Sequence, residues 1–345
     1  MRVLFAGYLG SPMETSWQRC ETLKSLGCEV RCIDQSKLGD LRQRRFLRRV
    51  DGRAFKAGNV ARLNAELVDV VRGFNPKVIW IEKGLLVQPE TLREIKGLVP
   101  DSRLVAFQDD NPFGARSYER GFWEAFVRAI PEYDLHFMKR QTDAEEFLRR
   151  GAARVEIFTT GFYEPAYGRP QAQPPDRYLH SVSFVGSALD DRARLIGGLL
   201  ERGMDLHVYG VRWERHWAYY RYNSRFHAAL PPAEHADVIW RSKINLGFVS
   251  HSNGDEYNGR SFDIPAAGGF LLTERTRAHE EFFKEGRDAA FYGSPAELEE
   301  KVSYYLANDG ERAAVARAGN ERAHRDRYSL SRRLGDALKA VEAIT

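Results

Sequence analysis

The residues with the clearest chemical potential lie between Asp255 and Gly269, in the segment DEYNGRSFDIPAAGG. The guanidinium of Arg260 could hold a diphosphate through two parallel hydrogen bonds. Asp263, at the start of an expected helix, could accept both hydroxyls of a ribose; the alternative is that it only caps this helix. The small residues that follow, Gly268 among them, would let the backbone approach a ligand closely. Arginine, acid and glycine-rich turn together favour nucleotide binding.

Two shorter stretches in the same half of the chain lie at the ends of apolar runs and could also contact a nucleotide. Gly186 and Ser187 form a turn that leads into a helical pattern beginning at Arg192. Backbone N–H groups at such a turn, together with a cation, suit a phosphate, although an ordinary strand-to-helix turn is the alternative. Tyr209 and Gly210 end the next apolar run, and Tyr209 could stack on a base or pack in the core. All five residues are candidates for the same ligand.

Two adjacent carboxylates, Asp109 and Asp110, directly follow an apolar run in the first half of the chain. Such a pair could supply a general base or hold the hydroxyl of an acceptor molecule. Helix capping or turn formation is the alternative. Further residues at the ends of apolar runs in this half are assigned to the same acceptor side: Gly7, Tyr8, Glu82, Lys83 and Asn111.

Short apolar runs alternate with helical patterns along the chain and would position these groups. In the first half we expect strands at 2–7, 29–33, 77–81, 103–107, 135–138 and 155–159. In the second half we expect them at 181–185, 206–209, 243–249 and 270–273. Continuous apolar runs separated by helices predict parallel sheets covered on both faces. Ligands of such sheets bind beyond the carboxyl ends of the strands, where the candidate residues lie.

The chain is long enough for about two domains, at roughly 150 residues each. The segment 165–175, PAYGRPQAQPP, is rich in proline and lacks periodicity, which is typical of a linker. We therefore predict two doubly wound α/β domains. The first covers 1–165 and contains the candidate acceptor-side residues; the second covers 176–328 and contains the candidate nucleotide-binding residues. A terminal helix within 329–345 follows.

Composition and missing motifs exclude several classes of protein. The hydrophobic fraction of 43% suits folded cores, and no stretch approaches the ~18 apolar residues of a membrane span. The N-terminus MRVLFAGYLG has no secretion signal, and three cysteines, at 20, 28 and 32, match no disulfide framework or zinc pattern. We expect a cytoplasmic protein. The G-x-G-x-x-G, G-x-x-x-x-G-K-[ST] and G-x-S-x-G motifs are missing, as is His-rich metal spacing.

The net charge of +4 is unevenly distributed, because six arginines fall between Arg42 and Arg53. Such a run is typical of a solvated helix face or loop. The alternative is contact with an anionic partner, such as lipid headgroups at a membrane surface or a polyanionic acceptor. No nucleic-acid motif accompanies the run, so we do not expect nucleic acid as a partner.

The run from Arg260 to Leu272, RSFDIPAAGGFLL, resembles the R-x-F-E-x-x-A-x-G-x-x-L segment of GT-B glycosyltransferases of group 1, and most closely their spore maturation protein CgeB-like branch. The resemblance covers nearly the whole chain. Supporting segments occur in the expected order: 79–84, 108–112, 184–187 with Arg192, 207–210 with Trp213, 304–306 and 324–332.

The resemblance implies two Rossmann-like domains that face a central cleft, with the C-terminal helix crossing back to the first domain. It implies a nucleotide-sugar donor on the second domain, where Arg260 would meet the diphosphate and Asp263 the ribose. The family usually has Glu at the position of Asp263, one methylene longer. Asp255 precedes Asp263 by the spacing of the family's paired acids, which would place it near the transferred sugar. No metal or cofactor is implied, because helix N-termini and cations stabilise the leaving diphosphate.

The expected activity is transfer of a sugar from a nucleoside diphosphate, UDP or another, to an acceptor hydroxyl of a glycan, protein or lipid-linked molecule. Asp109, Asp110 and Asp255 are the candidate catalytic residues. One alternative is a nucleotide-sugar epimerase of the same fold, which needs no acceptor. Another is a non-catalytic nucleotide-sugar-binding protein, which the replacement of the usual acid by Asp263 suggests. A periplasmic sugar-binding protein also has two α/β domains, but the missing export signal ranks it last.

Overall fold

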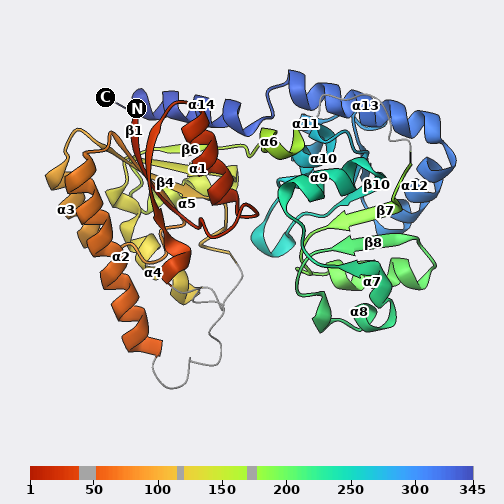
Figure 1. Ribbon diagram of the computed structural model, residues 1–345, viewed down its shortest axis with the longest axis horizontal. Helices are drawn as coiled ribbons and strands as arrows, with labels where there is room; N and C mark the ends of the chain where they lie inside the picture. The colour runs from red at the N-terminus through yellow and green to blue at the C-terminus, as the bar shows by residue number, and fades with distance from the viewer. Residues whose placement is uncertain (39–51, 115–119, 169–176, 345) are drawn as a thin grey trace. The chain divides into compact units, whose positions relative to one another are not determined.

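The computed structural model describes residues 1–38, 52–114, 120–168 and 177–344. It divides into two α/β units. In Figure 1 the first is drawn in red to yellow, with its C-terminal residues in blue, and the second in green to blue. Unit 1 contains Met1–Thr159 and Arg333–Thr345, and unit 2 contains Thr160–Arg332. Both sheets are parallel, so the predicted α/β class is confirmed.

Two regions that were singled out in the sequence fall largely outside the described residues. The arginines from 42 to 49 lie there, and Arg53 belongs to a helix in which its side chain is not described. Most of the expected linker, 169–175, lies there as well. Within the described ranges, no helix combines the length and the apolar character that a membrane crossing requires.

Unit 1 is built on a six-stranded sheet in the order β2-β1-β3-β4-β5-β6. Its strands are β1 (Arg2–Gly7), β2 (Glu29–Asp34), β3 (Val78–Glu82), β4 (Arg103–Gln108), β5 (Leu135–Met138) and β6 (Val155–Ile157). Its helices are α1 (Thr15–Ser25), α2 (Gly52–Phe74), α3 (Pro89–Leu98), α4 (Arg120–Ala129) and α5 (Gln141–Arg149). Since β1 pairs with both β2 and β3, the winding reverses between β1 and β3. Doubly wound sheets bind ligands at this kind of reversal.

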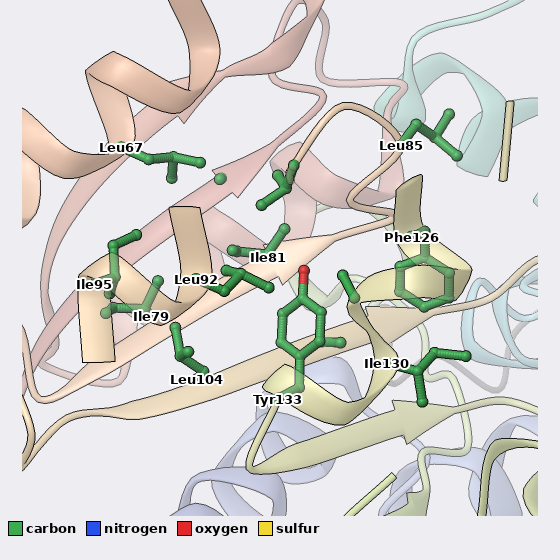
Figure 2. Packing of buried hydrophobic residues seen from close by; sticks show 14 of the residues in the cluster. Leu67, Ile79, Ile81, Leu85, Leu92, Ile95, Leu104, Phe126, Ile130 and Tyr133 are labelled. Atoms are coloured by element: carbon green, nitrogen blue, oxygen red, sulfur yellow. The ribbon is translucent and has the colours of Figure 1, made fainter. Parts of the chain in front are cut away.

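The central strand β3 shows why this sheet is buried on both faces. All five of its residues, VIWIE, are buried. Ile79 and Ile81 pack into a cluster with apolar side chains of α2, α3 and α4 (Figure 2). Trp80 points to the opposite face, where its ring stacks on Phe107 at 5.9 Å and on Phe137 at 5.3 Å between centroids. Burial of this apolar surface stabilises the unit and fixes the carboxyl end of β3 in place.

The last helix, α14 (Leu330–Glu342), leads from unit 2 into the part of the chain grouped with unit 1. It is amphipathic, with Leu334, Ala337 and Val341 buried along one stripe. Arg103, at the start of β4, donates from Nε to the carbonyl oxygen of Ile344 at 2.7 Å. The C-terminal segment therefore contributes directly to the sheet region of unit 1.

Unit 2 repeats the architecture with the sheet order β12-β11-β10-β7-β8-β9. Its strands are β7 (His180–Val185), β8 (Leu206–Tyr209), β9 (Phe226–His227), β10 (Ser242–Gly247), β11 (Leu271–Glu274) and β12 (Ala290–Tyr292). Its helices are α6 (Glu164–Tyr167), α7 (Arg192–Glu201), α8 (Trp217–Arg221), α9 (Pro232–Trp240), α10 (Arg260–Ala266), α11 (Arg277–Phe282), α12 (Pro295–Ala307) and α13 (Asp309–Arg325). The winding reverses between β7 and β10, which pair in parallel.

Candidate functional site

The carboxyl ends of β7 and β10 are neighbours at the reversal point of the unit 2 sheet, and Arg192 joins the loops that follow them. Its Nη2 donates to the carbonyls of Phe248 at 3.3 Å and Val249 at 3.1 Å, and its Nη1 donates to the carbonyl of Ser187 at 3.3 Å. Its Nε is buried and has no hydrogen-bond partner among the described residues. Burial and the positive charge of Arg260 lower the pKa of Arg192 to about 10. Arg192 therefore positions both loops and keeps one donor unused.

Arg260 and Asp263 begin α10, immediately after the β10 loop, and are three positions apart. Within the described part of the chain, their side chains form no hydrogen bond or ion pair with each other or with any other residue, and Arg260 Nε is buried. Burial lowers the pKa of Arg260, with Asp263 and Tyr167 opposing this effect. Buried polar groups are normally paired, because leaving them unpaired is unfavourable. A cation and an acid without such partners are suited to bind the polar groups of a ligand.

The protonation state of Asp263 follows from its surroundings. Burial raises the pKa of this carboxyl to about 8, and the positive charge of Arg260 offsets only part of the effect. At neutral pH the carboxyl of the free protein therefore carries a proton for most of the time. In that form it both donates and accepts hydrogen bonds, which matches the two hydroxyls of a vicinal diol.

Two further residues, Tyr167 of α6 and His235 of α9, belong to the same surroundings and were missed in the sequence. The hydroxyl of Tyr167 lies 2.8 Å from His235 Nδ1. The other ring nitrogen, Nε2, is buried without a partner among the described residues. Burial, followed by the charge of Arg260, lowers the pKa of His235 to about 3, so the ring is neutral. No sequence signal connects Tyr167 with His235, because they are 68 positions apart and meet only through helix packing.

A hollow of about 570 Å³ lies beside this region, between α7 and the carboxyl ends of β10, β11 and β12. Arg192, Val249, Glu274 and Tyr292 are among the residues that line it. Glu274 accepts from the backbone N–H of Val249 at 2.9 Å and contacts His251 Nε2 at 2.6 Å. Arg192 thus both lines the hollow and contacts the loops that follow β7 and β10.

The ring of Tyr209 is packed inside unit 2, which favours the alternative of core packing over stacking on a base. It is buried, its hydroxyl lies 2.7 Å from His180 Nε2, and its ring stacks on His227 at 4.5 Å between centroids. The backbones of Gly210 and Gly186 pack closely against each other next to Tyr209. A Cβ on Gly210 would lie 2.2 Å from the carbonyl oxygen of Gly186. These glycines allow two strand ends to pack closely, and a ligand contact at either of them stays a prediction.

Gly268 also lies away from the ligand-binding edge. It follows α10 and has a φ of 83°, which lets the chain turn before β11 begins. Because α10 starts at the carboxyl end of β10 and runs back along the sheet for seven residues, Gly268 lies near the amino end of β11. The helix separates it from Arg260 by about 10 Å along its axis. The turn explains the glycine at this position, and a ligand contact at Gly268 stays a prediction.

Asp255 lies in the β10 loop, but it is not an open carboxylate. Its Oδ1 accepts from Nδ2 of Asn253 at 3.0 Å, and its backbone N–H donates to the carbonyl of Ser250 at 3.0 Å. Asp255 contributes to the charge around both Arg192 and Arg260. Its proximity to a transferred sugar stays a prediction.

In unit 1 the expected acceptor residue Glu82 turns out to be inaccessible. Its side chain is fully buried, and both oxygens contact Arg19 of α1, with Nε to Oε1 at 2.5 Å and Nη2 to Oε2 at 2.7 Å. The hydroxyl of Ser16 donates to the same carboxylate. The prediction of an acceptor contact at Glu82 is wrong, because the carboxylate balances the charge of a buried arginine that sequence inspection did not identify.

Lys83, Asp109 and Asp110 remain together at the partly exposed edge of the unit 1 sheet. Lys83 Nζ lies 2.6 Å from Asp110 Oδ2 and 3.7 Å from Asp109 Oδ1. Arg19 Nη2 lies 3.7 Å from Asp109 Oδ2. The Asp109 side chain is 28% exposed, but its Oδ1 is buried and forms no hydrogen bond with any described residue. The two carboxylates therefore differ, because Asp110 is engaged in a close ion pair and Asp109 is held more loosely between two cations.

The remaining acceptor-side candidates shape loops at this edge. Asn111 Oδ1 accepts from the backbone N–H of Phe113 at 2.9 Å, which closes a turn. Gly7 ends β1, where a Cβ would come within 2.8 Å of the Phe5 ring. Tyr8 follows it and is partly exposed. The turn at Asn111 and the close approach at Gly7 are structural roles that account for these residue types.

Several solved structures have the same fold as this chain. Similar solved structures include sucrose-phosphate synthase from Thermosynechococcus elongatus, at 11% identity and a TM-score of 0.70 over 100% of both chains. HepE of Anabaena, in complex with UDP and glucose, has 13% identity and a TM-score of 0.67 over 99% of this chain and 100% of its own. The trehalose-6-phosphate structure from E. coli, bound with UDP-2-fluoro glucose, has 12% identity and a TM-score of 0.65 over 100% of both chains.

These likenesses define the fold of the chain as GT-B, as predicted. Residues 192–339 also match the family model described as glycosyl transferase-like. The match begins at Arg192 and includes Arg260 and Asp263. No curated protein matches the chain in sequence. The finer resemblance to the CgeB-like branch stays a prediction.

Proposed function

We propose that this protein is a glycosyltransferase that moves a sugar from a nucleoside-diphosphate donor, a UDP-sugar in the first instance, to an acceptor hydroxyl. One observation carries the proposal. The side chains of Arg260 and Asp263 form no hydrogen bond or ion pair with described residues, and they follow β10, where the winding of the unit 2 sheet reverses. The glycosyl transferase-like match covers this site. Neighbouring structures of the same fold hold UDP or UDP-sugars, which supports the choice of donor.

On the donor side, Arg260 binds the diphosphate and stabilises the negative charge that develops on it as the sugar leaves. Asp263 binds the ribose hydroxyls. Arg192 has a positioning role, because its terminal nitrogens already hold the backbone of the two loops. Gly186 and Ser187, the first two residues of the loop that follows β7, provide the phosphate-side turn. The two arginines supply the positive charge, so the proposed reaction needs no metal ion or cofactor.

On the acceptor side, Asp109 is the better candidate for the general base. A base must be able to accept the proton of the attacking hydroxyl. Asp110 is engaged by Lys83 at 2.6 Å, whereas Asp109 Oδ1 accepts no hydrogen bond from a described residue. Lys83 then keeps Asp110 in place, and Asp255 contributes negative charge near the sugar. The proposed location of the enzyme is the cytoplasm, and the acceptor is a glycan, a protein or a lipid-linked molecule.

The first test is a thermal-shift screen of UDP, other nucleoside diphosphates and their sugars. A ligand that binds the folded state raises Tm by mass action. We expect UDP and at least one UDP-sugar to raise Tm in the wild-type protein and in the Arg277→Ala control, whose arginine is 85% exposed. Arg260→Ala should lose the shift. If none of these nucleotides raises Tm, the donor assignment is incorrect.

The second test separates a transferase from the other two classes of protein. The protein is incubated with the UDP-sugar that binds, without an acceptor, and the sugar is followed by NMR. A transferase hydrolyses the donor slowly at most, whereas conversion to an epimer would establish an epimerase. A panel of acceptors is then added. Binding without turnover on every acceptor would favour a non-catalytic nucleotide-sugar-binding protein.

A further inference from the structure

Two of the three cysteines lie against each other in unit 1. Cys20 is buried in α1, and Cys32 is exposed on β2, the edge strand of the sheet. Their Sγ atoms are 3.0 Å apart. A disulfide bond has an S–S length of about 2.05 Å, so the two sulfurs need to approach by only about 1 Å. Cys28, in contrast, has no sulfur partner among the described residues.

The environment of the two sulfurs gives them different reactivities. The contact with Cys20, helped by the positive charge of Lys24, lowers the pKa of Cys32 to about 7. The same contact, together with burial, raises the pKa of Cys20 above its usual range. At neutral pH, Cys32 is thus partly a thiolate that reagents in solution can reach, whereas Cys20 keeps its proton inside the protein. An exposed thiolate with a second thiol in contact is the usual arrangement of a redox-active pair.

We propose that Cys20 and Cys32 form a reversible disulfide that links α1 to the edge strand β2. With a disulfide oxidant such as oxidised glutathione, the Cys32 thiolate attacks one sulfur and releases one glutathione thiolate. Cys20 then loses its proton to solvent and attacks Sγ of Cys32, which releases the second glutathione. The two cysteine thiols lose two electrons and two protons, and the oxidant is reduced to two molecules of glutathione.

The cross-link has a structural consequence because of its neighbours on α1. Ser16 and Arg19, from the same helix, hold the buried carboxylate of Glu82 at the end of β3. A covalent link at Cys20 restrains this helix and closes a loop between residues 12 positions apart. Such a loop reduces the conformational freedom of the unfolded chain. The oxidised protein is therefore the more stable form, independently of the function proposed above.

The direct test is a thiol count. The reduced wild-type protein is incubated with oxidised glutathione, alkylated and analysed by intact mass and peptide mapping. We expect one alkylated cysteine, Cys28, in place of three, and a Cys20–Cys32 peptide that a reductant separates. Thermal unfolding should show a Tm higher by about 5 °C, and the increase should disappear after reduction.

Two variants complete the test. Cys28→Ser should form the same cross-link as the wild-type protein. Cys32→Ser, which alters an exposed side chain and should fold, should retain two alkylated cysteines after oxidation. The proposal is overturned if the wild-type protein keeps three free thiols. It is equally overturned if glutathione stays attached to Cys32, if the cross-link contains Cys28, or if covalent dimers form.

Discussion

Arg19 and Glu82 form a buried ion pair that joins α1 to the carboxyl end of β3. Two nitrogen–oxygen contacts of 2.5 and 2.7 Å hold the pair, and the side chains are 3% and 0% exposed. The guanidinium carbon also lies 4.1 Å from the centroid of the Phe107 ring. The pair lies where the winding of the unit 1 sheet reverses, so a buried ion pair occupies this edge of the sheet.

Removal of Arg19 should destabilise the protein strongly. In Arg19→Met the carboxylate of Glu82 stays buried without its partner, and we expect a loss of about 3–5 kcal/mol in the free energy of unfolding. The double variant Arg19→Met/Glu82→Leu should recover much of the loss, because it removes both charges. The control is Lys24→Met, whose ion pair with Glu21 is exposed and should contribute less than about 1 kcal/mol. Urea unfolding gives the free energy of unfolding of all three variants. A smaller loss in Arg19→Met than in Lys24→Met would contradict the expectation.

Arg260→Ala should weaken donor binding without unfolding the protein. A charge-assisted contact between arginine and phosphate contributes about 1.5–3 kcal/mol, so Kd for UDP should rise roughly 10- to 100-fold. Arg260→Lys should fall between the wild-type protein and Arg260→Ala, because an ammonium cannot form two parallel hydrogen bonds. Calorimetric titration with UDP gives the affinities, with Arg277→Ala as the control. Equal affinities in Arg260→Ala and the control would remove Arg260 from the site.

Asp263 should make the stability of the free protein depend on pH. Its folded-state pKa of about 8 lies above the usual range of a carboxyl, so the native state binds more protons than the unfolded chain between about pH 4 and 8. The contribution of Asp263 to stability therefore decreases as pH rises through this window and is constant above it. Asp263→Asn lacks this dependence. Its stability relative to the wild-type protein should increase from pH 5 to pH 8.

Unfolding free energies of both proteins at several pH values test this expectation. Asp101→Asn, which alters an exposed aspartate, serves as the control and should follow the wild-type curve. Parallel curves for Asp263→Asn and the wild-type protein would show that the Asp263 carboxyl titrates in the ordinary range.

Gly210→Ala should disrupt the junction of β7 and β8. The φ of Gly210 is 149°, and an added Cβ would lie 2.2 Å from the backbone oxygen of Gly186, which cannot move independently. We expect a loss of about 3 kcal/mol or more. Gly203→Ala is a matched control, because its φ is also positive, at 81°, but open space surrounds it. That variant should lose only about 1 kcal/mol. Thermal unfolding compares the two, and equal losses would exclude the steric explanation.

Most of the fold could be predicted from the sequence, because long apolar strands carry their own signal. Arg2–Gly7, Leu135–Met138 and Leu206–Tyr209 have the predicted bounds. The strands Phe226–His227 and Ala290–Tyr292 were not predicted, because two or three residues show no periodicity. The neighbouring strands of the sheet, rather than local preference, determine that such short segments are extended.

The candidate site was predictable only where its chemistry is local in the sequence. Arg260 and Asp263 are three positions apart and could be identified together. Arg19 and Glu82 are 63 positions apart, and only the folded structure brings them together. The sequence places Glu82 at the edge of a sheet, but it does not indicate that a helix covers the carboxylate. For the same reason, Tyr209 could be placed at a strand end without any indication that histidines enclose it.

The grouping of Arg333–Thr345 with unit 1 has a consequence for how the protein is made. Unit 1 includes both the first and the last residues of this sequence, whereas unit 2 is continuous from Thr160 to Arg332. During translation, all of unit 2 leaves the ribosome before unit 1 has received its final helix. Unit 2 can therefore finish folding before unit 1 is complete. A truncation that removes Arg333–Thr345 would consequently damage unit 1 and leave the chain of unit 2 intact.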